Sequence, residues 1–232
     1  MDPHAGQPIL ASGPPLADAR LAAILIHGRG ASAEDILSLT HELRVKDVAY
    51  LAPQAAGASW YPNTFLAPLE RNEPGLSSAL RVVASLIEEA GGHGVPPSRI
   101  VLMGFSQGAC LSLEFAARHA QRYAAVIGLS GGLIGPPGTP RDYSGTLDRT
   151  PVFLGCSDID PHIPLERVHE TAEVFKRMGA EVEAQGGHAP LVVEGGRALR
   201  AFRYELPVAS AQVKSCVLLA GLYAGDGPTV AV

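Results

Sequence analysis

A serine flanked by glycines is the strongest chemical signal in this sequence. Gly104-Phe105-Ser106-Gln107-Gly108 has the spacing G-x-S-x-G, follows a short apolar run and precedes an apolar stretch that begins at Ala109. A serine on a sharp strand-to-helix turn exposes its hydroxyl, and the N-terminus of the helix stabilises developing negative charge. We therefore predict that Ser106 is a nucleophile. The alternative is a helix N-cap serine in a turn of small residues.

A second turn of small residues follows the apolar run at residues 21–26. It reads His27-Gly28-Arg29-Gly30, and its glycines let the backbone approach a bound oxygen atom. The backbone amides of Arg29 and Gln107 are candidates for an oxyanion hole, which binds the negative charge formed in acyl transfer. A plain glycine turn with a structural histidine is the alternative.

A third turn supplies candidate acids. The apolar run at residues 152–154 is followed by Asp158 and Asp160. An acid after a late strand can orient the histidine of a catalytic triad, and this chain has the order serine, aspartate, histidine. Either aspartate could instead cap the helix expected from Leu165 onward, so these residues alone leave the choice open.

The elements that must position these turns form an alternating pattern. Short apolar runs predict buried strands at residues 21–26, 48–51, 100–103, 124–129 and 152–154. Stripes with helical spacing lie between them, at residues 76–90 and 165–178. The predicted fold class is α/β, a mostly parallel sheet with helices on both faces, in which ligands bind beyond the carboxyl ends of the strands.

Composition excludes several classes of protein. The chain has 232 residues, 47% of them hydrophobic, and a net charge of −5, which argues against disorder and against nucleic-acid binding. The sequence has no apolar run long enough for a membrane span and no signal-peptide pattern at its start. Three widely spaced cysteines fit reduced thiols in the cytoplasm.

These motifs resemble the phospholipase/carboxylesterase family, which contains the acyl-protein thioesterases, over about residues 21–182. The matching stretches are LIHGRG, YLAPQAAGASWYPNTFLAPLE, RIVLMGFSQGACLSLEFAAR, VIGLSGGLIGP and VFLGCSDIDPHIPLERV. The resemblance implies an α/β-hydrolase fold and a serine mechanism with no metal and no organic cofactor.

The same resemblance implies roles for individual residues. It makes Ser106 the nucleophile and selects Asp160, in DPHIP, as the triad acid. It also makes the amides of Arg29 and Gln107 the oxyanion hole. Trp60 and Tyr61 resemble positions on a loop that borders the acyl-binding site, with simple packing under that loop as the alternative.

The end of the chain does not continue this resemblance. Residues 186–232 resemble an internal piece of 3-phosphoshikimate 1-carboxyvinyltransferase, in which the run SAQVKS, here residues 210–215, is a substrate-binding element. We therefore expect an α/β-hydrolase domain over residues 1–185, with about the first 17 residues loosely ordered. Residues 186–232 are expected to be a foreign segment and not an independent domain. That piece alone cannot supply the transferase's site, which needs groups from two large lobes.

The catalytic histidine falls where the chain departs from the family. After Asp160 the candidates are His162 in the same turn, His169 on a predicted surface helix, and His188, which follows two glycines. His188 is the expected base, although it comes several residues earlier than the family pattern places it. At ~3.3 Å per residue of strand, a deletion of a few residues moves the ring by about 10 Å.

The residues thus predict a serine hydrolase acting on small-molecule carboxylic esters or thioesters through an acyl-enzyme intermediate. A different class is the alternative: a catalytically impaired hydrolase-fold binding protein, or a fusion product, that lacks a properly placed histidine. The sequence leaves a homodimer open.

Overall fold

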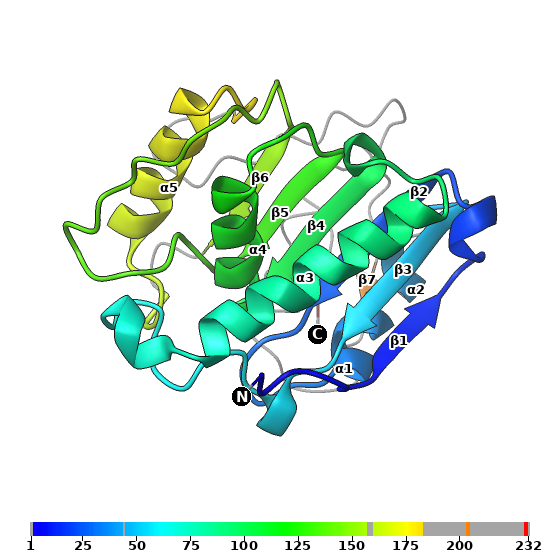
Figure 1. Ribbon diagram of the computed structural model, residues 1–232, viewed down its shortest axis with the longest axis horizontal. Helices are drawn as coiled ribbons and strands as arrows, with labels where there is room; N and C mark the ends of the chain where they lie inside the picture. The colour runs from blue at the N-terminus through cyan, green and yellow to red at the C-terminus, as the bar shows by residue number, and fades with distance from the viewer. Residues whose placement is uncertain (1, 44, 157–159, 183–202, 205–229, 232) are drawn as a thin grey trace. The chain divides into compact units, whose positions relative to one another are not determined.

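The computed structural model describes residues 2–43, 45–156, 160–182, 203–204 and 230–231 (Figure 1). The chain divides into two units, residues 1–191 and residues 192–232. In the second unit, β7 (Arg203–Tyr204) pairs in parallel with β8 (Val230–Ala231). The domain boundary that the sequence suggests, between residues 185 and 186, stays a prediction.

The first unit is built on a six-stranded sheet with the order β1-β3-β2-β4-β5-β6 (Figure 1). Its strands are β1 (Ile9–Ser12), β2 (Leu21–Ile26), β3 (Val48–Pro53), β4 (Ile100–Phe105), β5 (Ala125–Leu129) and β6 (Val152–Gly155). All neighbours are parallel except β1 and β3. The five strands expected from apolar runs are present, so the carboxyl ends of β2, β4, β5 and β6 meet at one edge of the sheet.

The N-terminal segment differs from the expectation that about the first 17 residues lie loosely on the surface. Ile9 to Ser12 form the edge strand β1, with Ile9 opposite Pro53 and Ser12 opposite Tyr50. His4 is buried, and its Nε2 lies 2.9 Å from the carbonyl oxygen of Trp60. Proline and glycine around β1 mark its turns correctly, but four residues are enough for an edge strand held by backbone hydrogen bonds.

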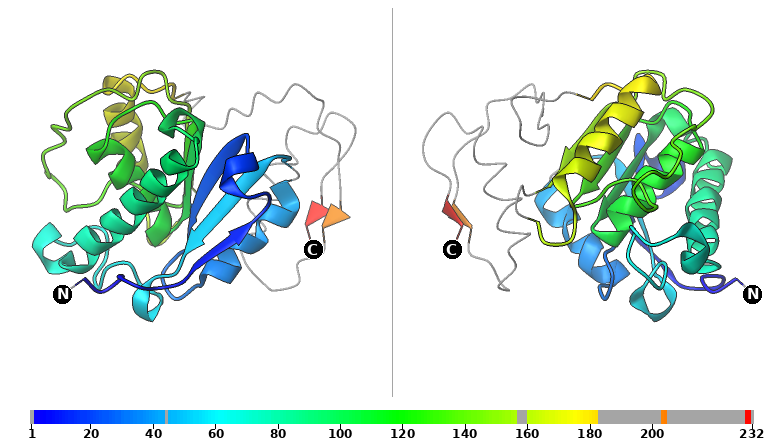
Figure 2. Two further views of the ribbon diagram at one scale, coloured as in Figure 1. Left: turned by 45° about the vertical axis from the view of Figure 1, so that its right-hand side comes forward. Right: turned by 90° about the vertical axis from the view of Figure 1, so that its left-hand side faces the viewer.

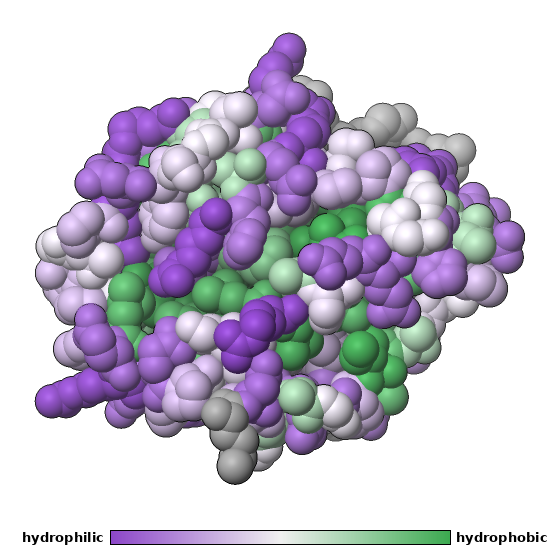
Figure 3. Space-filling model, viewed as in Figure 1, coloured by the Kyte–Doolittle hydropathy of each residue, from purple (hydrophilic) through white to green (hydrophobic). Residues whose placement is uncertain are grey.

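Helices cover both faces of the sheet (Figures 1 and 2). They are α1 (Ala33–Ser38), α2 (Thr40–Leu43), α3 (Gly75–Gly92), α4 (Gln107–Arg118) and α5 (Leu165–Arg177). One hydrophobic cluster joins α3, α4 and α5 to one face, and a second joins α1 to the other. On the face formed by α3, α4 and α5, hydrophobic residues show between polar ones (Figure 3). Parallel strands buried on both faces explain why the strands are continuous apolar runs.

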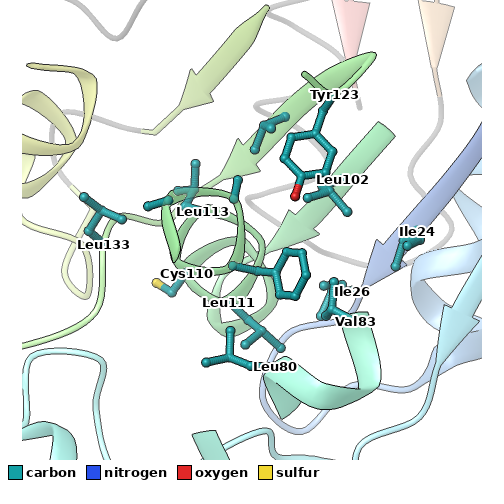
Figure 4. Packing of buried hydrophobic residues seen from close by; sticks show 14 of the residues in the cluster. Ile24, Ile26, Leu80, Val83, Leu102, Cys110, Leu111, Leu113, Tyr123 and Leu133 are labelled. Atoms are coloured by element: carbon teal, nitrogen blue, oxygen red, sulfur yellow. The ribbon is translucent and has the colours of Figure 1, made fainter. Parts of the chain in front are cut away.

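Helix α4 is the most deeply buried helix among those described. Every residue from Gln107 to Ala117 is buried, and hydrophobic side chains from α3, the sheet and Leu133 surround the helix (Figure 4). Its one carboxylate, Glu114, accepts hydrogen bonds from Arg118 Nε at 2.7 Å and from the backbone N–H of Ile134 at 2.9 Å. The buried charge is therefore paired, and it fixes the segment after β5 onto the helix.

Candidate active site

Ser106 sits on a strained turn between β4 and α4. Its φ of 53° and ψ of −116° are unusual for a residue with a side chain. The turn is held on both sides: Ser106 N–H donates to the carbonyl of Leu129 at 2.8 Å, and Cys110 N–H donates to the carbonyl of Ser106 at 3.0 Å. This is the strand-to-helix turn that the G-x-S-x-G spacing predicts.

Both glycines of the motif are required by close backbone contacts. A Cβ on Gly104 would lie 2.6 Å from the amide nitrogen of Ala109, and a Cβ on Gly108 would lie 2.6 Å from the carbonyl oxygen of His27. Real side chains do not tolerate such distances. The absence of side chains at these positions therefore lets α4 start directly against β4 and the end of β2.

The turn after β2 lies beside Ser106. A Cβ placed on Gly28 would be 3.4 Å from the Cβ of Ser106, so the segment that carries Arg29 borders the predicted nucleophile. Gln107 is the first residue of α4, where backbone N–H groups have no partner within the helix. The two residues predicted to form the oxyanion hole thus lie on elements that flank Ser106. Whether their amides converge on one oxygen stays a prediction.

His27 is the buried support of this turn. It is 1% exposed, its Nε2 accepts the N–H of Ala55 at 3.1 Å, and its Nδ1 lies 2.8 Å from the carbonyl of Gly28. Because Nε2 accepts, the ring proton is on Nδ1 and His27 is neutral. Its backbone carbonyl in turn accepts the indole N–H of Trp60 at 2.9 Å. The sequence alternative of a structural histidine agrees with these contacts.

We expect His27 to make stability depend on pH. Burial lowers the pKa of His27 below its usual 6.5 and outweighs the opposing hydrogen bond to Gly28. The unfolded chain binds the proton more readily, so this stability is complete above about pH 6.5 and is lost as the pH falls through the lowered pKa. Urea midpoints measured from pH 7.5 to 5 should therefore fall more steeply in the wild type than in His27→Gln, whose amide oxygen can still accept from Ala55. Equal slopes would contradict this prediction.

Trp60 and Tyr61 are both buried, with 0% and 2% exposure. They lie against the start of α4, because Gln107 Oε1 accepts the N–H of Trp60 at 2.9 Å and Gln107 Nε2 donates to the carbonyl of Tyr61 at 2.8 Å. The segment therefore adjoins the nucleophile turn, as the resemblance implies. That the aromatic rings contact an acyl group stays a prediction.

Asp160 follows β6, at the sheet edge where β4 ends in Ser106. Its Oδ1 accepts the backbone N–H groups of His162 at 2.8 Å and Ile163 at 3.1 Å, which fixes the carboxylate in its turn. Its Oδ2 lies 3.8 Å from the Sγ of Cys156. The alternative of a turn-capping aspartate describes Oδ1 well. Oδ2 has a different partner, the thiol of Cys156.

The other candidates for the triad either lie outside the described residues or are exposed. Asp158 and His188 lie outside the described residues. His162 and His169 are both exposed, the latter on α5. Within the described ranges, no cluster of three or more histidine, cysteine or acidic side chains could hold a metal ion.

Cys110, four residues after Ser106, carries a thiol, which is a nucleophilic group when it is ionised. It lies in the first turn of α4 and is 1% exposed. Burial raises the pKa of its thiol to about 12, which outweighs the hydrogen bonds that act in the opposite direction. The thiol therefore stays protonated.

The side-chain roles of Arg29 and Gln107 are not predicted by the sequence. Only their backbone amides carried a prediction, yet both side chains bind the segment around Trp60. For Gln107 the motif does indicate that the side chain lies near the site, because Gln107 directly follows the predicted nucleophile. For Arg29 no signal was present, since arginine between two glycines usually lies in solvent.

A family model described as phospholipase/carboxylesterase matches residues 14–189, more than half of the chain. The chain belongs to the phospholipase/carboxylesterase family. The chain is 42% identical in sequence to a phospholipase/carboxylesterase from Dyadobacter fermentans whose crystal structure is known. That comparison covers 79% of this chain and 87% of the other, with a TM-score of 0.76. The fold is therefore that of the α/β-hydrolases, and the family is that of an esterase-type hydrolase.

A second family model matches the end of this phospholipase/carboxylesterase. The model, described as EPSP synthase (3-phosphoshikimate 1-carboxyvinyltransferase), matches residues 164–232, so the two matches overlap over residues 164–189. The transferase of Salinibacter ruber is 39% identical over 132 residues, which are 50% of this chain and 30% of the relative. That of Vesicomyosocius okutanii is 58% identical over 48 residues, which are 21% of this chain and 11% of the relative. The chain thus spans less than a third of the length of these curated relatives, and the resemblance of its C-terminal segment to them is confirmed.

None of the helices in the described parts of the chain has the length and hydrophobicity that crossing a bilayer requires.

Proposed function

We propose that this phospholipase/carboxylesterase is a serine hydrolase that cleaves small-molecule carboxylic esters or thioesters through an acyl-enzyme intermediate. The observation that carries the proposal is the strained Ser106 turn, with φ of 53°, at the start of the buried helix α4. A residue with a side chain adopts such a backbone conformation at a cost, and nucleophile turns are where this cost serves the chemistry.

The first half of the reaction transfers the acyl group to the serine. Ser106 Oγ attacks the carbonyl carbon while His188 accepts the hydroxyl proton, and the carbonyl oxygen becomes an oxyanion. The amides of Arg29 and Gln107 donate hydrogen bonds to this oxyanion. The intermediate collapses by breaking the bond to the alcohol or thiol, which takes the proton from His188. Water then repeats these steps and releases the carboxylic acid.

Asp160 orients the imidazole in this scheme. Its Oδ1 accepts the backbone N–H groups of His162 and Ile163, and its Oδ2 accepts the Cys156 thiol at the long distance of 3.8 Å. We propose that Oδ2 is the oxygen that also binds the histidine. The family match supports His188 as the partner, because it extends to residue 189. Trp60 and Tyr61, which adjoin the nucleophile turn, border the acyl group.

The test compares two histidine variants on p-nitrophenyl esters of increasing acyl length. His188→Ala should lower kcat/KM by about 10³-fold or more. His169→Ala, on an exposed position of α5, is the matched control and should stay near the wild-type rate. Equal, slow rates for the wild type and His188→Ala would overturn the proposal and favour an impaired hydrolase-fold binding protein. The overlap of the transferase match with the region of His188 is the observation that favours that second candidate.

We place the enzyme in the cytoplasm, where thiols such as the buried thiol of Cys110 stay reduced.

A further inference from the structure

Five consecutive residues, 59–63, receive an unusual number of side-chain hydrogen bonds; we call them the Trp60 loop. Arg29 alone makes four of these bonds. Its Nη1 donates to Ser59 Oγ at 2.9 Å and to the carbonyl of Pro62 at 3.1 Å, and its Nη2 donates to the carbonyls of Tyr61 at 2.8 Å and Asn63 at 2.5 Å. Both terminal nitrogens of the guanidinium therefore have all their hydrogens bound to one loop.

The side chain of Gln107 binds the same loop. Its amide oxygen accepts the backbone N–H of Trp60 at 2.9 Å, while its amide nitrogen donates to the carbonyl of Tyr61 at 2.8 Å. The carbonyl of Tyr61 thus accepts from both Arg29 and Gln107. The loop is bound at once to the turn after β2 and to the first residue of α4.

The charge of Arg29 is directed at neutral oxygens. Among the described residues, no carboxylate lies within ion-pair distance of its guanidinium, whereas Arg81, Arg118 and Arg141 all have such partners. The guanidinium also lies 6.0 Å from the centre of the Tyr61 ring. Four of the five N–H groups of the side chain therefore bind the loop, in a fork geometry that lysine cannot reproduce.

Two backbone connections close the assembly. The indole N–H of Trp60 donates to the carbonyl of His27 at 2.9 Å, and the N–H of Gly30 donates to the carbonyl of Ala58 at 2.7 Å. Arg29 thus lies in sequence between His27, which binds Trp60, and Gly30, which binds the residue just before the loop. We therefore expect a shift of the Trp60 loop to move the backbone of Arg29, and the reverse.

We infer that the side chains of Arg29 and Gln107 are positioning residues that couple the Trp60 loop to their own backbone amides. The inference rests on the proposed function, in which these two amides form the oxyanion hole. Each of these residues then has two roles, carried by different atoms. Its backbone amide donates a hydrogen bond to the oxyanion, and its side chain binds the loop that borders the acyl group. The two amides have the correct spacing for the oxyanion only when both side chains are bound to the loop.

The chain contains a built-in probe for this coupling, because Trp60 is its single tryptophan and is 0% exposed. Arg29→Met keeps the backbone amide and an unbranched side chain, but it removes the guanidinium and with it all four bonds. We expect acrylamide quenching of Trp60 fluorescence to rise by about twofold in Arg29→Met, because the loop opens locally. Arg29→Lys should lie between this variant and the wild type. Arg20→Met, at an exposed arginine before β2, is the matched control and should leave quenching unchanged.

The kinetic readout separates positioning from a loss of folded protein. With rates normalised to the number of sites labelled by a fluorophosphonate at completion, kcat for an acetyl ester should fall about tenfold in Arg29→Met while KM stays nearly constant. Gln107→Leu should act in the same direction. The double variant should lose less than the product of the single effects, because both changes release one loop.

The outcomes are distinct. Raised quenching with an unchanged kcat would show a clamped loop without coupling to the hole, and would overturn the inference. Unchanged quenching would overturn it as well. A wild type without any hydrolysis would refute the proposed function instead, and the quenching comparison would still decide whether Arg29 holds the loop.

Discussion

Ser106→Ala should lower kcat for an acyl ester by about 10⁶-fold, and should abolish covalent labelling by a fluorophosphonate. The reason is that the whole scheme passes through a bond to Ser106 Oγ. The oxyanion amides of Arg29 and Gln107 remain in the variant, so only slow attack by water is left. Stopped-flow or continuous assays of p-nitrophenyl ester hydrolysis measure the rate, and intact-mass spectrometry measures the label.

Ser112→Ala is the matched control for this change. Ser112 lies on the same helix, is fully buried, and its hydroxyl has no hydrogen-bond partner among the described residues. Removing an unpaired buried hydroxyl costs little and can stabilise a protein. The control should therefore keep the wild-type rate. A Ser106→Ala protein that still turns over at the rate of Ser112→Ala would exclude Ser106 as the nucleophile.

Gly108→Ala should strongly destabilise the folded protein. The added Cβ would lie 2.6 Å from the carbonyl oxygen of His27 and would also clash with that of Ile26. Both oxygens are backbone atoms at the end of the central strand β2, so neither can move without disturbing the sheet. We expect the free energy of unfolding to fall by at least about 4 kcal/mol, measured by urea denaturation followed by circular dichroism.

Gly91→Ala provides the comparison. Gly91 lies in the last turn of α3, and a Cβ there would meet no atom within 4 Å. Alanine is the better helix former, so this variant should match the wild type or gain up to about 1 kcal/mol. Similar urea midpoints for Gly108→Ala and Gly91→Ala would show that the crossing of β2 and α4 is looser than the structure indicates.

The sheet could be predicted from sequence because buried parallel strands leave a clear pattern. The run at Leu21–Ile26 is apolar at every position, since both faces of β2 are covered. The turns after β2, β4 and β6 then fall at one edge of the sheet, so the sequence alone predicts that Arg29, Ser106 and Asp160 lie at the same edge. The G-x-S-x-G motif is informative because any such turn brings backbone atoms too close to these two positions for a side chain, so glycine is required there.

Other features of the site leave no pattern in the sequence. Three of the four bonds from Arg29 end on backbone carbonyls, which every residue carries, so no pairing of residue types predicts them. The burial of His4 against Trp60 depends on a chain path across 56 positions. The edge strand β1 is short and only half buried, and its alternation is too brief to separate from a loop. The position of His188 stays a prediction for a different reason, because it lies outside the described residues.

The buried thiol of Cys110 has a consequence for reagent selectivity. Helix N-termini usually activate sulfur, but a pKa of about 12 leaves Cys110 without thiolate, and its burial excludes bulky electrophiles. We therefore expect this helical turn to offer the proposed oxygen nucleophile, Ser106, to acylating and phosphonylating agents, while Cys110 stays closed to maleimides and iodoacetamide. Alkylating reagents can thus be used on the native protein without modifying Cys110.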